Sequence, residues 1–100
     1  MEREFFAGFI KIHILYHAAA GEICGTEIAK ELARHGYKVS PGTLYPTLHG
    51  LERMGYLKRV DKIVEGRRRK YYSGTPAGKR ALEAARKRIR ELWKEVMEDA

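Results

Sequence analysis

The sequence predicts a single, mainly helical domain with one small β-hairpin and a long C-terminal helix. Three observations support this fold class. Glycine and proline residues divide the 100-residue chain into five segments. Apolar residues recur at helical spacing in four of these segments, whereas residues 56–73 mix apolar and charged residues as a hairpin does. A chain of this length can bury only one modest core, so one compact unit accounts for it.

The first predicted helix covers residues 3–19. It is apolar on most of its circumference, so it needs packing partners on most sides. In so short a chain, we expect one of these partners to come from a second subunit. The two separate apolar faces are formed by Phe5, Phe9, Ile12 and Tyr16, and by Phe6, Ile10, Ile14 and His17.

The second predicted helix covers residues 25–35 and turns Ile28, Ala29 and Leu32 inward. Gly36 follows it, as glycine commonly does at a helix C-terminus. A short connection then leads to the third helix.

Ser40 and Pro41 predict the start of the third helix, since serine is a good N-cap and proline suits the first helical position. Pro46 lies inside this helix and predicts a bend rather than a break, because it is close to the N-terminus. Leucines at spacings of four and three form its buried stripe, and the opposite face is expected to be exposed. The stripe is Leu44, Leu48 and Leu51, and the opposite face is Gly42, Pro46, His49 and Arg53.

Two strands, Tyr56–Val64 and Arg69–Ser73, are predicted to form a hairpin with Glu65 and Gly66 near its turn. Four consecutive basic residues, Arg67 to Lys70, are placed at its tip. An isolated hairpin is marginally stable in water, so this one must pack against the helices.

Thr75 and Pro76 predict the start of the last helix, which runs to about residue 98. Its apolar residues recur at alternating spacings of three and four, which is typical of a helix–helix seam. We therefore divide the chain into a helix-turn-helix and hairpin region, residues 1–75, and a dimerisation helix, residues 76–100. The predicted dimer interface comprises Phe6, Phe9, Leu82, Ala85, Ile89, Leu92, Trp93 and Val96.

The positive charge is concentrated in one stretch. Residues 53–72 contain eight Lys or Arg against two Asp or Glu, in a chain with a net charge of +7. A local basic block on a small domain indicates a polyanionic partner. Three helices followed by a basic hairpin form a winged helix-turn-helix, in which the third helix fits the major groove of double-stranded DNA.

Particular residues carry a further resemblance. They are Ser40-Pro41-Gly42-Thr43-Leu44-Tyr45-Pro46, Leu48, Leu51-Glu52, Gly55-Tyr56-Leu57, Arg68-Arg69-Lys70-Tyr71-Tyr72 and Thr75-x-x-Gly78. At this spacing they resemble the PadR-like transcriptional regulators, in particular the small subfamily with a single C-terminal helix. The chain departs from the pattern at Thr26, where many relatives have an aromatic residue, and at Gly74, where an apolar residue is usual.

The resemblance implies that the third helix reads DNA, that the hairpin contacts the DNA backbone or minor groove, and that the protein is a homodimer. It also implies a repressor that a small molecule releases. The DNA-binding residues that the resemblance implies are Ser40, Gly42, Thr43, Tyr45, Arg67, Arg68, Arg69 and Lys70. His49 and Arg53 are further candidates, because they lie on the face of the third helix that is expected to be exposed.

Trp93 is first interpreted as a residue that packs in the dimer interface. The alternative hypothesis is that Trp93, Phe6, Phe9 and Ile89 line a site for a flat aromatic effector between subunits. We expect no cofactor and no metal site. His13 and His17 have the spacing of a ligand pair, but zinc needs three or four ligands. Cys24 would be a third ligand only by accident of packing, and we expect it to be a small buried residue.

The sequence contains no constellation typical of an enzyme. A single cysteine is compatible with a reducing cytoplasm, and Lys11 and His13 interrupt the apolar run of residues 5–20, which argues against a membrane span. Two alternative functions stay open. One is a protein-interaction module that uses the winged-helix surfaces, and the other is an architectural DNA binder without sequence preference.

Overall fold

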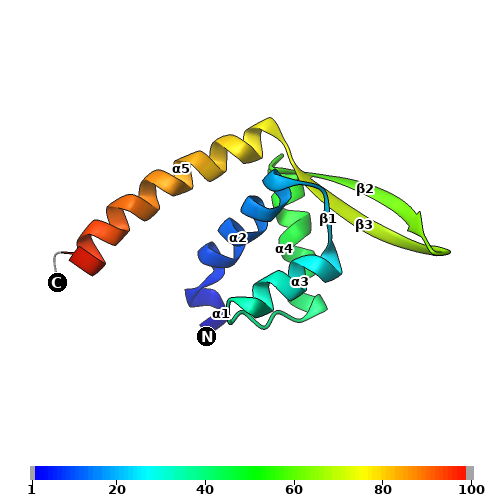
Figure 1. Cartoon of the computed structure of the whole chain (residues 1–100), viewed down its shortest axis with the longest axis horizontal. Coiled ribbons are helices and arrows are strands. Elements are labelled where there is room, and N and C mark those ends of the chain that lie inside the picture. Colours follow the sequence, from blue (N-terminus) through cyan, green and yellow to red (C-terminus); the bar gives the residue numbers. More distant parts are fainter. Residues whose placement is uncertain (1, 99–100) are drawn as a thin grey trace.

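The computed structural model describes residues 2–98, with side chains from residue 4 onward. Three helices, α2, α3 and α4, gather in a central body, while the β2–β3 hairpin and α5 extend from it in different directions (Figure 1). The predicted fold class is confirmed. The elements are α1 Glu2–Phe5, α2 Ala7–Ala20, β1 Ile23–Cys24, α3 Gly25–Arg34, α4 Pro41–Arg53, β2 Leu57–Val64, β3 Arg67–Gly74, α5 Pro76–Trp93 and a π-helical turn Lys94–Glu98.

The N-terminal region differs from the single helix predicted over residues 3–19. It is divided into α1 and α2 at Phe6, whose carbonyl accepts a hydrogen bond from the Ile10 amide at 3.0 Å. Only one of the two apolar faces of α2 lies in the core, where Ile10 and Ile14 are buried. The other face leaves Phe9 and Tyr16 exposed.

One core connects all the large elements. Tyr72 of β3 is fully buried in it, together with Ile14 of α2 and Leu48 of α4. The buried stripe predicted for α4 is confirmed, and the helix continues through Pro46. The remaining core residues are Ile10, Leu15, Ala18, Ile28, Leu32, Leu44, Leu51, Leu57 and Leu82.

The sheet has three antiparallel strands in the order β1-β3-β2, whereas the sequence predicted only the hairpin. β1 was not predicted, because a strand of only two residues is too short to show the alternation of apolar and polar residues that marks a strand. The turn at Glu65 and Gly66 is confirmed, and both residues have positive φ, at 51° and 76°. This conformation gives a two-residue turn whose twist matches that of the flanking strands.

The placement of the four basic residues at the tip is wrong in one respect. β3 begins at Arg67, so Arg67 to Lys70 lie within the strand and pair with Val64 to Asp61. Strand side chains alternate between faces, so the four cations are divided between the two sides of the hairpin.

Two glycines allow the elements to approach closely at the base of the hairpin. A β-carbon on Gly74 would lie 3.1 Å from the Cα atom of Ala19, so the departure from the family pattern at this position makes room for α2. A β-carbon on Gly78 would lie 2.1 Å from the carbonyl oxygen of Tyr56. Gly78 also donates its amide to the Thr75 hydroxyl at 3.0 Å, which caps α5.

The predicted seam of α5 is exposed along most of its length. Leu82 is only 6% exposed and belongs to the core of its own chain, whereas Leu92 and Trp93 are 46% and 55% exposed. Beyond Leu82, therefore, residues 4–98 leave most of the apolar side of the helix exposed. Among residues 2–98, no helix has both the length and the apolar character that a membrane crossing requires.

The Gly78 contact leads to a stability prediction. Substitution Gly78→Ala forces a backbone shift at Tyr56 and should lower the free energy of unfolding by about 1–3 kcal/mol. Gly50→Ala is the matched control, because a β-carbon there meets only the Arg53 guanidinium at 4.0 Å. This control should raise stability by about 0.5–1 kcal/mol, since alanine is favoured in helices. Urea denaturation of both variants measures the difference, and equal effects would contradict the tight contact.

Candidate nucleic-acid interface

The exposed face of α4 forms the first part of the candidate interface. Gly42, Pro46 and Arg53 are exposed on the side opposite the leucine stripe, as predicted. His49 lies on the same side but is half-buried, and its Nε2 atom is buried with no hydrogen-bond partner among the described residues. The expectation of a fully exposed His49 is therefore wrong.

The hairpin forms the second part. Arg68 pairs with Ile63, Lys70 with Asp61, and Tyr72 with Arg59. Side chains directly opposite in a ladder lie on the same face. Since Tyr72 points into the core, Arg68, Lys70 and Arg59 all lie on the hairpin face that turns toward the helices.

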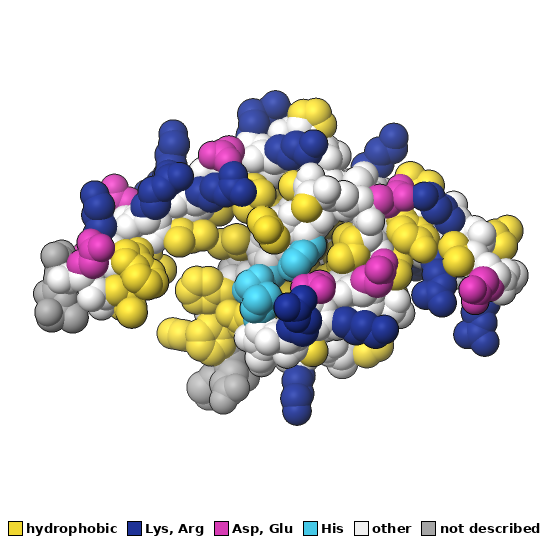
Figure 2. Space-filling model, in the orientation of Figure 1, with side chains coloured by type: hydrophobic (Ala, Val, Ile, Leu, Met, Phe, Trp, Pro, Cys, Tyr) yellow, Lys and Arg dark blue, Asp and Glu magenta, His cyan; other side chains and the backbone are white. Residues whose placement is uncertain are grey.

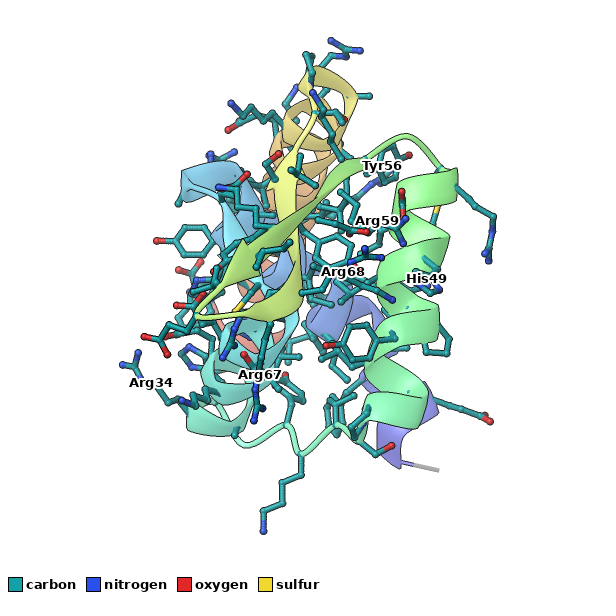
Figure 3. The ribbon with its side chains drawn as sticks, turned by 90° about the vertical axis from the view of Figure 1, so that its right-hand side faces the viewer. Arg34, His49, Tyr56, Arg59, Arg67 and Arg68 are labelled. Carbon is teal, nitrogen blue, oxygen red and sulfur yellow. The ribbon has the colours of Figure 1, made fainter. Side chains whose placement is uncertain are left out.

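The two parts meet at Tyr45. The Lys70 ammonium group lies 5.4 Å from the centre of the Tyr45 ring, so this face of β3 is next to α4. Figure 3 looks onto this side of the molecule, where Arg59 and Arg68 lie between the hairpin and α4, on which His49 is labelled. We call the exposed α4 residues together with Arg59, Arg68 and Lys70 the basic face.

Arg59 is a member of the basic face that sequence reasoning missed. Its side chain faces the same way as Arg68 only because of the strand register, and the register is visible in the sequence only once Tyr72 is known to be buried. Asp61 lies 3.4 Å from the Arg59 guanidinium and partly balances its charge.

The opposite face of the hairpin is electrostatically different. Lys62 is hydrogen-bonded to Glu22, which raises the pKa of the lysine, and its ammonium group lies 5.0 Å from the centre of the Tyr71 ring. Arg69 lies opposite Lys62, and its Nε atom is buried with no hydrogen-bond partner among the described residues. Within the described part of the chain, Arg67 and Arg68 form no ion pair, so their charges remain available to a partner.

Tyr45 is held in place rather than freely exposed. Its half-buried ring packs on the core and against Gly25, where a β-carbon would lie 2.5 Å from the tyrosine hydroxyl. Beside it is a groove of about 370 Å³, lined by Cys24, Gly25, Thr26, Tyr45 and residues 67–70. The packing fixes the direction of the tyrosine hydroxyl at the edge of the basic face.

Two further predicted residues, Ser40 and Thr43, lie at the start of α4. Ser40 is exposed at the N-cap, and Thr43 is half-buried beside Lys11 of α2. Thr47 donates a hydrogen bond to the Thr43 carbonyl at 2.8 Å. Pro41 has no amide hydrogen and the Thr43 amide donates to the Ser40 carbonyl at 3.0 Å, so it is the helix dipole that makes this end of α4 favourable for negatively charged groups.

Cys24 is buried, as expected, and it also caps α3. Its thiol donates to the Glu27 carboxylate at 3.1 Å, and its amide donates to the same oxygen at 3.3 Å. These two hydrogen bonds lower the pKa of Glu27 below its ordinary value. The capped start of α3 forms one wall of the Tyr45 groove.

The residues predicted to line an effector site come from two segments. Phe9 and Trp93 are exposed, Ile89 is 40% exposed, and Phe6 is half-buried with its ring centre 6.2 Å from that of Tyr37. Figure 2 shows hydrophobic side chains gathered at the end of α5 and on the N-terminal helices that face it.

A third histidine joins the predicted pair. His35 lies beside His13 and His17, a proximity that the sequence could not reveal because it depends on how α3 packs against α2.

Three helices, a basic hairpin and an exposed helix face beside it define a winged helix-turn-helix protein. A family model described as the transcriptional regulator PadR-like family matches residues 14–84. The chain belongs to the PadR-like family of transcriptional regulators.

Individual relatives agree with this assignment. The transcriptional regulator Rv3488 of Mycobacterium tuberculosis is 50% identical over 95 residues, which cover 95% of this chain and 89% of that protein. A transcriptional regulator from Clostridium thermocellum has a similar structure, with a TM-score of 0.81, 29% identity and 96% of both chains covered. Bacillus subtilis PadR in complex with operator DNA has a TM-score of 0.68 and 24% identity, over 76% of this chain and 45% of that one.

Proposed function

We propose that this PadR-like regulator is a repressor that binds a pseudo-palindromic DNA operator as a homodimer. The observation that carries the proposal is the basic face, which places an exposed helix surface and unpaired arginine side by side. A helix that fits the major groove reads base edges, while arginine and lysine beside it bind phosphates. The fold is shared with Bacillus subtilis PadR, which has been solved in complex with operator DNA.

Within this proposal the residues have different tasks. Gly42, Thr43 and His49 lie on or beside the helix surface that would enter the groove, so they influence which sequence is preferred. Arg68 and Lys70, from the neighbouring strand, bind the backbone or the minor groove, where narrow regions attract arginine. Ser40, Tyr45, Arg53, Arg67 and Arg69 surround these positions and contribute further contacts.

The homodimer is supported by the exposed side of α5. Ile89, Leu92 and Val96 are 40%, 46% and 55% exposed on one side of a helix that projects from the body (Figure 1). Pairing this side with its symmetry mate removes the apolar surface from water. Residues 1–75 then bind DNA and residues 76–100 dimerise, with half-sites about one helical turn, roughly 34 Å, apart.

The same interface is also where a small molecule would bind to release the repressor from DNA. Trp93, Phe6, Phe9 and Ile89 supply aromatic and aliphatic surface on the sides that face the partner. A flat aromatic effector stacked among them would change the spacing of the two basic faces. Aromatic rings stack favourably with such ligands at centroid separations of about 4.5–7 Å.

The first experiment is a titration of the protein against DNA from upstream of its own gene and against scrambled DNA of equal length, at two salt concentrations. The proposal predicts affinity for the native sequence at least about 10³-fold above the scrambled one. Equal, salt-sensitive affinities would instead indicate an architectural DNA binder. Absence of binding at low salt would indicate a protein-interaction module.

Arg68→Ala tests the role of the hairpin. Because each phosphate contact contributes about 0.9 to the slope of log K against log salt, this variant should reduce the slope by about one unit on any DNA sequence. Lys87→Ala on the outer side of α5 is the control for the lost charge and should leave the slope unchanged. An unchanged slope for Arg68→Ala would remove the hairpin from the proposed interface.

Leu92→Asp tests the dimer. Placing a carboxylate in the apolar seam should convert the dimer into a folded monomer at micromolar concentration, because an unpaired charge is costly to bury. Ala84→Asp adds the same charge at an exposed position off the seam and should leave the dimer intact. Sedimentation velocity measures both, and a monomeric parent protein or a dimeric Leu92→Asp variant would contradict the α5 interface.

A further inference from the structure

Three of the four histidines of the chain converge outside the basic face. His13 and His17 are one helical turn apart on α2, and His35 is the residue that caps the end of α3. One ring nitrogen from each lies within 4.8 Å of the other two. Figure 2 shows histidine side chains together at the centre of one face of the molecule.

The three rings are close to one another and to a carboxylate. The rings of His13 and His35 stack with centres 4.7 Å apart, and the Glu31 carboxylate lies 3.6 Å from Nε2 of His17. Burial, followed by the neighbouring His35 and His17, lowers the pKa of His13, so the neutral ring is favoured. Neutral imidazole is the form that binds metals.

We propose that His13, His17 and His35 form a binding site for a first-row divalent transition-metal ion, with Zn²⁺ as the best match. Imidazole ligands suit zinc and its neighbours, whereas calcium and magnesium prefer oxygen. Three histidines provide the ligand number of an open zinc site, in which water takes the fourth position.

The geometry requires a small adjustment. Zn–N bonds of about 2.0 Å in a tetrahedral site put ligand nitrogens roughly 3.3 Å apart, so the rings must draw together by at most about 1.5 Å. His35 is exposed and can turn about its side-chain bonds without disturbing the core. Glu31 supplies a negative charge that stabilises a dication held by neutral ligands, although it also pairs with Arg34 at 3.1 Å.

A bound ion would cross-link α2 to the end of α3. These two helices have different neighbours, since α2 packs against α5 and α3 packs against α4. Metal binding should therefore raise the melting temperature of the folded chain, because a ligand that binds only the folded state stabilises it.

The test is a Co²⁺ titration of tag-free, EDTA-treated full-length protein, followed by visible d–d absorption. The proposal predicts one Co²⁺ per chain, bleaching of the band by Zn²⁺, and a higher melting temperature with either ion. His49→Gln is the matched control, since it removes a histidine from another element and should leave the metal affinity unchanged. A parent protein that develops no band at millimolar Co²⁺ would overturn the site.

His35→Gln is the decisive variant because an exposed side chain can be replaced without loss of the fold, which circular dichroism verifies. It should lower the metal affinity by more than about tenfold, since even residues that only orient a ligand contribute about 10–100-fold. His13→Gln and His17→Gln should do the same. Affinity that survives in His35→Gln contradicts the site. Because absorption is read without DNA, this inference and the proposed operator binding can fail independently.

Discussion

The complete burial of Tyr72 is the constraint on which the basic face depends. Its ring fills the core where β3 meets the helices, and its hydroxyl is also buried, which raises the pKa of the phenol. Because side chains alternate along a strand, an inward Tyr72 fixes Lys70 and Arg68 on the face turned toward α4. A slip of one residue would direct Arg69 and Tyr71 inward instead and bury a charge. The electrostatics of the hairpin is thus a consequence of how the core is packed.

The same core sets the direction of α5. Gly78 contacts the Tyr56 carbonyl too closely for any side chain, and Leu82 is buried one turn further on, so the first turns of the helix are rigidly attached to the base of the hairpin. Beyond Leu82, the side chains of Ile89, Leu92 and Val96 on the apolar side of α5 are 40%, 46% and 55% exposed. In the proposed homodimer a second copy would cover this side, because a two-fold interface pairs the same surface of both subunits.

Local signals in the sequence were sufficient for most elements, since caps, glycines and leucine spacing depend on near neighbours. The first residues of α4 and α5 follow from Ser40-Pro41 and Thr75-Pro76 in this way. Features that depend on distant contacts were not predictable. β1 exists only because β3 pairs with it, Arg59 joins the basic face only through the register, and His35 meets His13 only because α3 packs on α2. Even the break at Phe6 lies inside an uninterrupted apolar pattern.

α2 explains why a helix in so small a protein is apolar on most sides. Around its circumference it presents Ile14 to the core, Phe9 and Tyr16 to the solvent, and His13 and His17 to the end of α3. Lys11, on the remaining side, lies beside Thr43 of α4. Since cores transmit small displacements instead of absorbing them, a shift of α2 caused by a subunit partner, an effector or a metal ion would reach α4 through this single helix. The helix with the first apolar pattern in the sequence, α2, is therefore the element through which the proposed regulatory contacts are connected to α4.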